Sequence, residues 1–102
     1  MPVGKWEQAE PGVRRKIYPP GKHLMMMEVQ FEAGAVGSEH SHPHEQYTYC
    51  LEGKFEFKVD GKTVMLTPGE TLHIPGNAVH GVKALQDGTL LDTFTPVRED
   101  LL

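Results

Sequence analysis

The chain is built from short apolar segments that end at glycine, proline, asparagine or aspartate, and none of them shows the apolar period of a helix. The clearest is Lys54–Val59, in which apolar and charged residues alternate. This two-residue period is typical of a strand with one buried face. Asp60-Gly61 follows directly and favours a tight hairpin into a second extended segment, Lys62–Leu66. The sequence therefore predicts an all-β fold.

Further segments of the same kind predict the remaining strands. We expect them at Leu24–Phe31, Tyr47–Leu51, Thr71–Ile74, Gly81–Leu85 and Thr89–Thr95. Many short strands joined by tight turns, such as Pro68-Gly69, indicate a jelly-roll barrel, also called a double-stranded β-helix. The run Met25–Met27 must alternate between two faces. We expect one face in the core and the other at an interface or a lid.

Length and composition restrict the functions open to the chain. With 102 residues, we expect one domain over residues 1–102, and a core thin enough for a homodimer to aid stability. The net charge of −4 and the isoelectric point of about 5.8 argue against a nucleic-acid partner. No apolar run approaches membrane-spanning length, and residues 1–10 lack the apolar region of a secretory signal. We therefore expect a cytoplasmic protein with no membrane partner.

Several bulky residues are expected to pack rather than to act chemically. Cys50 is the one cysteine, which excludes an intrachain disulfide, and its apolar neighbours favour a buried packing role over a nucleophile. Trp6 is expected in the core or at an interface. Tyr47 and Tyr49 have the opposite parity to Gln46, so they should face away from any site that includes Gln46.

The candidate functional residues gather in Gly37–Gln46, where His40, His42 and His44 occupy alternate positions. Residues i and i+2 of a strand point to the same face, with side chains about 6–7 Å apart. Two imidazoles at that spacing can bind one metal ion with bonds of about 2.1 Å. The His-x-His pattern therefore predicts a metal site rather than the alternative, a set of surface loop histidines.

Two further residues can complete such a site. Gln46 offers a neutral carbonyl oxygen, and His80 lies in a turn-rich segment as the distant ligand. His44 follows Pro43, which interrupts strand pairing, so we expect it at the rim rather than on the metal. His23 and His73 lack partners at ligand spacing, and we expect structural roles for both.

The motifs around these ligands resemble those of the cupin superfamily. The first cupin motif contains glycine, His-x-His, an acid or amide, and glycine, here Gly34 or Gly37, His40, His42, Gln46 and Gly53. The second contains Pro-Gly, proline, a glycine-like turn residue and histidine, here Pro68-Gly69, Pro75, Asn77 and His80. The resemblance implies a single cupin domain with motif one at about residues 34–53 and motif two at about residues 68–81.

Gln46 departs from the usual cupin pattern, which has glutamate at this position. An amide removes one negative charge from the metal shell, which favours Lewis-acid chemistry and an anionic substrate over redox tuning. Three imidazoles and an amide suit one divalent ion of zinc, nickel, iron or manganese.

The C-terminal segment Gly88–Asp100 resembles the ending of the pectin-degradation cupins, which linearise unsaturated monouronates released from pectin and alginate. The similarity includes the amide ligand and extends to Leu51–Gly53 and His80-Gly81. It implies an isomerase-like or lyase-like metalloenzyme of carbohydrate metabolism that acts on a small acidic sugar. In that family, the residues that match Asp92, Phe94 and Arg98 belong to the active site.

The chemistry of these three side chains agrees with that reading. Asp92 lies in an apolar strand, where an unpaired carboxylate is costly, and can shuttle protons. Phe94 shares its face and can form an apolar wall against the sugar. Arg98 can bind a substrate carboxylate or orient Asp92. Alternatively, Asp92 and Arg98 form a structural ion pair that closes the barrel.

The residues leave other functions open beside the linearisation of unsaturated monouronates. One alternative is a cupin dioxygenase or a sugar isomerase that uses the same metal. Another is a non-catalytic cupin that binds a small acidic ligand. Gln46 and the pair Asp92 and Arg98 favour linearisation over the dioxygenase, but they separate it poorly from a binding protein.

Overall fold

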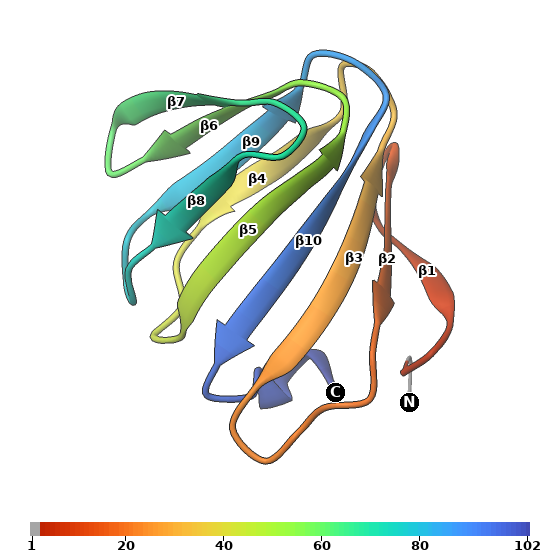
Figure 1. Cartoon of the computed structure of the whole chain (residues 1–102), viewed down its shortest axis with the longest axis vertical. Helices are drawn as coiled ribbons and strands as arrows, with labels where there is room; N and C mark the ends of the chain where they lie inside the picture. Colours follow the sequence, from red (N-terminus) through yellow and green to blue (C-terminus); the bar gives the residue numbers. More distant parts are fainter. Residues whose placement is uncertain (1–2) are drawn as a thin grey trace.

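The computed structural model describes residues 3–102, and its named strands pair antiparallel in two sheets that face each other (Figure 1). The strands are β1 (Trp6–Glu10), β2 (Val13–Ile17), β3 (Met25–Phe31), β4 (Val36–His40), β5 (Glu45–Glu52), β6 (Phe55–Val59), β7 (Lys62–Leu66), β8 (Thr71–Ile74), β9 (His80–Ala84) and β10 (Gly88–Thr95). The larger sheet has the order β1-β2-β3-β10-β5-β8, and the smaller has the order β4-β9-β6-β7. The predicted all-β jelly roll is confirmed.

The helical content of the described chain is one short 3-10 turn at Glu99–Leu101. Within residues 3–102, no helix has the length and apolar character needed to cross a membrane.

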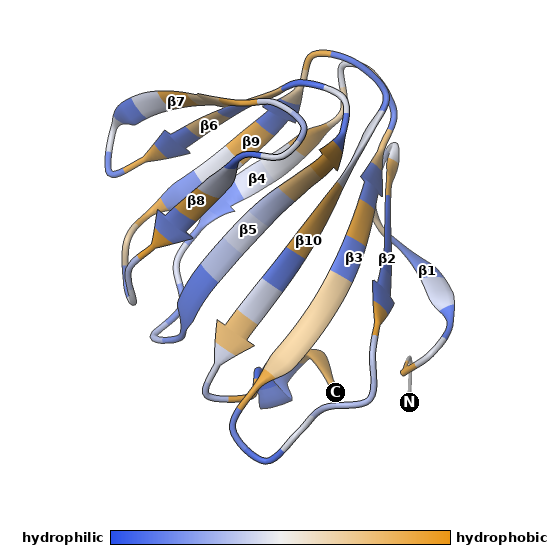
Figure 2. Ribbon diagram, in the orientation of Figure 1, coloured by the Kyte–Doolittle hydropathy of each residue, from blue (hydrophilic) through white to orange (hydrophobic). Residues whose placement is uncertain are grey.

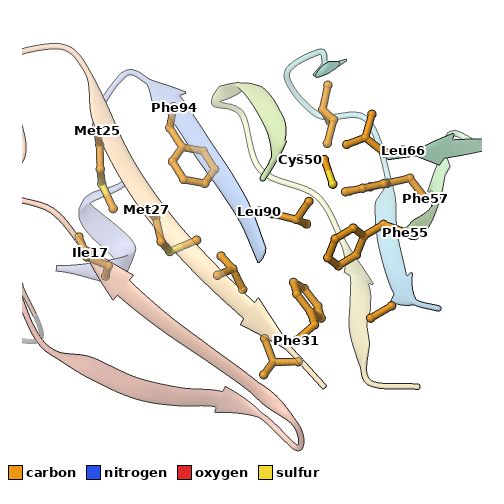
Figure 3. Close-up of a cluster of buried hydrophobic side chains, with 14 of the residues drawn as sticks. Ile17, Met25, Met27, Phe31, Cys50, Phe55, Phe57, Leu66, Leu90 and Phe94 are labelled. Carbon is orange, nitrogen blue, oxygen red and sulfur yellow. The ribbon is translucent and has the colours of Figure 1, made fainter. Parts of the chain in front are cut away.

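Alternating burial along the strands places the core between the two sheets. In β10, every second residue from Gly88 onward is buried, and β5 has the same pattern from Gln46 to Cys50. Figure 2 shows polar residues at the start of β5 and apolar ones near its end, where Cys50 and Leu51 precede Glu52. The apolar part of the interior includes Phe31, Phe55, Phe57, Leu66 and Leu90 (Figure 3). The interior therefore has an apolar end and a polar end, and the polar end holds the candidate site.

The predicted hairpin between β6 and β7 is confirmed, and it supports the strand that carries His80. Asp60 and Gly61 both have positive φ angles, 48° and 80°, as a two-residue turn of this kind requires. The Asp60 N–H donates to the carbonyl of Val79 at 2.8 Å, and the Val79 N–H donates to Asp60 Oδ1 at 2.9 Å. The turn thus holds the residue that precedes His80.

The structure confirms the expected burial of Cys50 and the expected alternation of the methionines and tyrosines between two faces. Cys50 is fully buried, and Met26 is exposed while Met25 and Met27 are buried. Tyr47 and Tyr49 lie on the outer face of the larger sheet, away from the interior. Trp6 is 36% exposed, so it does not lie in the core, and its expected place at an interface stays a prediction. It lies on the edge strand β1, where the guanidinium of Arg14 stacks 5.0 Å from its ring centroid.

Candidate metal centre

Three of the predicted ligands come together at the polar end of the barrel. His40 ends β4 and His80 begins β9, and the two are partners in the strand register. His42 lies in the loop between β4 and β5. One ligand atom from each of the three lies within 4.8 Å of the others. His42 and His80 are buried, whereas His40 is exposed.

Backbone carbonyls fix the proton position on each of the three imidazoles. Nδ1 of His40 bonds to the Ser38 carbonyl at 2.9 Å, Nδ1 of His42 to that of His44 at 3.0 Å, and Nδ1 of His80 to that of Ala78 at 2.9 Å. A carbonyl only accepts hydrogen bonds, so each Nδ1 carries the proton and each Nε2 keeps a free lone pair.

The free nitrogens fit a divalent metal ion. Nε2 of His80 is buried and has no hydrogen-bond partner within residues 3–102, which is costly for a polar atom unless it binds a cation. Burial, assisted by the neighbouring His40, His42 and Arg98, lowers the pKa of His80 to about 4, although the hydrogen bond to the Ala78 carbonyl acts in the opposite direction. Burial, followed by the charge of Arg98, also lowers the pKa of His42. The buried imidazoles are therefore neutral near pH 7, as metal ligation requires.

A buried line of polar groups leads away from the histidines across the larger sheet. Gln46 Oε1 lies 3.1 Å from Nε2 of His42, and Gln46 Nε2 donates to Thr48 Oγ1 at 2.9 Å. The Thr48 hydroxyl in turn donates to Asp92 Oδ1 at 2.7 Å. The register explains this line, because Asp92 is the β10 partner of Thr48. Burial raises the pKa of Asp92 to about 6, although the hydrogen bond from Thr48 and the nearby Gln46 amide act in the opposite direction.

Arg98 approaches the same cavity from the C-terminal turn. Its guanidinium carbon lies 5.1 Å from the ring centroid of Phe94, and that ring meets His42 edge-on at 5.8 Å. The guanidinium donates to Asp100, from Nη2 to Oδ2 at 2.7 Å and from Nε to Oδ1 at 3.4 Å. The interior cavity has a volume of about 350 Å³, and its lining includes His40, Gln46, His80, Asp92, Phe94 and Arg98.

The alternative in which Arg98 and Asp92 form a structural ion pair is wrong, and so is the option that Arg98 orients Asp92 through such a pair. The ion pair of Arg98 within residues 3–102 is with Asp100. The reason is local, because Asp100 lies in the 3-10 turn directly after Arg98, whereas strand register directs Asp92 toward Thr48. The structure nevertheless brings all of the predicted site residues to one end of the barrel.

Two residues of the site were missed by sequence reasoning, Thr48 and Asp100. Thr48 has the parity of Gln46 in a predicted strand, which is a signal that could have placed it on the same face. Asp100 had no comparable signal.

His44 lies beside the histidine cluster, with its ring centroid 5.5 Å from that of His42 and its carbonyl as the acceptor for His42. His73 bonds to Glu45 at the surface, away from the site.

Comparison with known proteins identifies the class to which this fold and site belong. The family model described as "Cupin domain" matches residues 27–94, and the chain belongs to the cupin family.

Within that family, the expected kinship with pectin-degradation cupins is confirmed. The chain is 39% identical to the pectin degradation protein KdgF of Dickeya dadantii (strain 3937), over 95% of this chain and 90% of the relative. It superimposes on the structure of KdgF from Halomonas sp. with a TM-score of 0.91 and 39% identity, covering 96% of this chain and 91% of that one. A solved RmlC-like cupin from Shewanella frigidimarina NCIMB 400 also has a TM-score of 0.91, with 35% identity over 97% of this chain and 89% of that chain.

Proposed function

We propose that this chain is a metal-dependent enzyme that opens the ring of 4,5-unsaturated monouronates and converts them to open-chain 5-keto acids. One observation carries the proposal: a buried carboxylate, Asp92, and a guanidinium, Arg98, line the cavity that is also lined by two of the clustered histidines, His40 and His80. That combination suits a small anionic substrate that must exchange protons. The similarity to proteins named for pectin degradation supports the substrate class.

The metal would be held by His40, His42, His80 and Gln46. A divalent ion at such a site supplies a Lewis acid that polarises an oxygen of the substrate or holds its carboxylate. Zinc, nickel, iron and manganese all suit this set of ligands.

The reaction is an isomerisation whose two proton transfers balance. Asp92 removes the proton from the anomeric hydroxyl, the bond from carbon 1 to the ring oxygen breaks, and carbon 1 becomes an aldehyde. The released ring oxygen is then an enolate oxygen on carbon 5. Asp92 returns the proton to carbon 4, and carbon 5 becomes a ketone. The formula of the substrate is unchanged, so the step needs no oxidant or reductant.

Arg98 and Phe94 would position the sugar for these transfers. Asp100 engages Nε and Nη2 of Arg98, which leaves the Nη1 end of the guanidinium for the substrate carboxylate. Phe94 would offer an apolar wall that is itself braced by Arg98 and His42. The cytoplasmic location and the homodimeric state expected from the sequence stay predictions.

The test is a direct assay with freshly generated unsaturated monouronate. Its ultraviolet absorbance, which depends on the carbon 4–carbon 5 double bond, should fall faster with the metal-loaded protein than in buffer alone. A rate equal to the spontaneous rate would reject the proposal. Consumption of dioxygen with a phenolic or diketone substrate would instead favour the alternative of a cupin dioxygenase.

A further inference from the structure

We propose that Thr48 is a positioning residue that orients the Gln46 amide, so that its oxygen rather than its nitrogen faces the three histidines. The inference rests on the proposed function at one point only, which is the role of Asp92 as the acid that accepts a hydrogen bond from Thr48. It concerns the metal site itself, so metal binding alone can test it.

The position of Thr48 makes it the link between Gln46 and Asp92. Its side chain is fully buried in the middle of β5, two residues after Gln46 on the same face and opposite Asp92 in register. Its hydroxyl oxygen is 2.9 Å from Gln46 Nε2 and 2.7 Å from Asp92 Oδ1. Both are ordinary hydrogen-bond distances, so one hydroxyl group satisfies two buried neighbours.

The number of available protons determines which group donates and which accepts in the hydrogen bonds that join Gln46, Thr48 and Asp92. A hydroxyl has one proton to donate, and a carboxylate can only accept, so the Thr48 proton goes to Asp92 Oδ1. Only the lone pairs of Thr48 then face Gln46, and a lone pair can bond to the amide NH₂ but not to the amide oxygen. The amide oxygen must therefore point to the other side, toward His42.

The contact between the Gln46 amide and His42 supports the same orientation. Because Nδ1 of His42 donates to the His44 carbonyl, its Nε2 carries a lone pair, and this atom lies 3.1 Å from Gln46 Oε1. Two lone-pair atoms at that distance repel each other unless a cation lies beside both. The orientation set by Thr48 is thus the one in which Gln46 and His42 can share a metal ion.

An amide needs such a guide, whereas a carboxylate does not. The two oxygens of a glutamate are equivalent, so either can face the metal. The two ends of a glutamine differ, and an inverted amide would present its NH₂ group to the cation. The same hydrogen bonds fix the proton position on Asp92: since Oδ1 accepts from Thr48, the proton that Asp92 exchanges belongs on Oδ2.

The experiment compares metal binding by the full chain and its Thr48 variants, with Zn²⁺ affinity measured against a chromophoric chelator. Thr48→Val keeps the shape of the side chain but removes the hydroxyl, and should weaken Zn²⁺ binding about 10- to 100-fold, as is typical for the loss of a group that orients a ligand. Thr48→Ser restores the hydroxyl and should bind within about threefold of the parent chain. Thr93→Val, a matched change on the outer face of β10, should have no effect. The visible spectrum of the Co²⁺-loaded protein should change in Thr48→Val alone.

The same substitution of Thr48, made in a chain that also carries a Gln46 variant, separates an orienting role of Thr48 from a packing role. In Gln46→Glu, the ligand no longer has two different ends, so adding Thr48→Val should change Zn²⁺ affinity by less than about threefold. An equal loss in both backgrounds would show that Thr48 only packs, and would overturn the inference. So would unchanged affinity in Thr48→Val, or unchanged affinity in Gln46→Ala. A failure of the proposed sugar chemistry would leave these metal measurements unaffected.

Discussion

The Asp92 carboxylate has its orientation set by a hydroxyl group rather than by a cation. It is buried and accepts from Thr48, and both guanidiniums that line its cavity are paired elsewhere, Arg98 with Asp100 and Arg15 with Glu7. A carboxylate in this situation is free to exchange a proton, because no salt bridge within the described part of the chain holds it in the charged form. Removing its acid–base function without changing its shape is therefore the most direct test at the scale of one residue.

We expect Asp92→Asn to lower the enzyme-catalysed rate of uronate ring opening about 100- to 10,000-fold, because an amide cannot take up and return the proton. The amide oxygen can still accept from Thr48, so Zn²⁺ content should stay at the parent level. The measurement is the decay of ultraviolet absorbance, corrected for the spontaneous rate, together with metal analysis of the same sample. Loss of the metal in this variant would instead assign a structural role to Asp92.

The residues that could be predicted from the sequence are those whose spacing carries the signal. His40 and His42 are two apart, and Gln46 and His80 stand where the cupin motifs require them. The partner of Arg98 could not be predicted, because it depends on the path of a short turn. Thr48 was missed because a threonine in a strand is ordinary, and its role appears only when register places it opposite Asp92.

Among the elements, strands with strong apolar alternation were predicted within a residue or two of their observed ends. The strands β1, β2 and β4 were not predicted. The first and the last of these are sheet edges whose side chains mostly face solvent, so their sequences carry no two-residue pattern. β2 is fully buried only at its two ends, Val13 and Ile17, with polar residues between. Pairing to neighbouring strands, rather than local sequence, defines these elements.

The β6–β7 hairpin gives a prediction at this scale. Asp60→Ala should lower the free energy of unfolding by about 1 kcal/mol, because alanine is disfavoured at positive φ and cannot accept from the Val79 N–H. Asparagine tolerates positive φ and keeps an acceptor oxygen, so Asp60→Asn should stay within about 0.5 kcal/mol of the parent. Urea denaturation measures both variants. Equal losses in the two would contradict this account of the turn.

At the scale of the whole molecule, the metal ligands would join the two sheets. His40 and His80 come from the smaller sheet and Gln46 from the larger. The ligands meet only in the folded chain, so a bound metal should stabilise it by mass action, by about 2.7 kcal/mol when the free ion is at 100 times its Kd.

We therefore expect Zn²⁺ to raise the midpoint of thermal unfolding, and a chelator to reverse the effect. His80→Ala should abolish this dependence. His73→Ala, which removes a histidine from the outer surface, should retain it. A midpoint that responds to Zn²⁺ equally in both variants would place the stabilising ion elsewhere on the protein.

We expect the second copy in the homodimer predicted from the sequence to pack against the outer face of the larger sheet. Register places Met26 beside Thr93 and Thr93 beside Tyr47, and the ring of Tyr47 lies 5.1 Å from that of His73. Tyr47 is 54% exposed, and Tyr49 and Met26 are also exposed on this face. A chain this small has a thin core, so burying these apolar groups against a second copy would add to its stability.

We expect light scattering to give a mass of twice 11.4 kDa. Tyr47→Glu should shift the protein toward the monomer, because each interface would then bury an unpaired carboxylate. Met65→Glu is the matched control, since Met65 is similarly exposed but lies on β7 of the smaller sheet. A parent chain that elutes as a monomer, or a dimer broken by Met65→Glu and not by Tyr47→Glu, would contradict the choice of this face. The metal cavity lies inside the barrel, behind this face, so a monomeric Tyr47→Glu variant should still bind Zn²⁺ with the affinity of the parent chain.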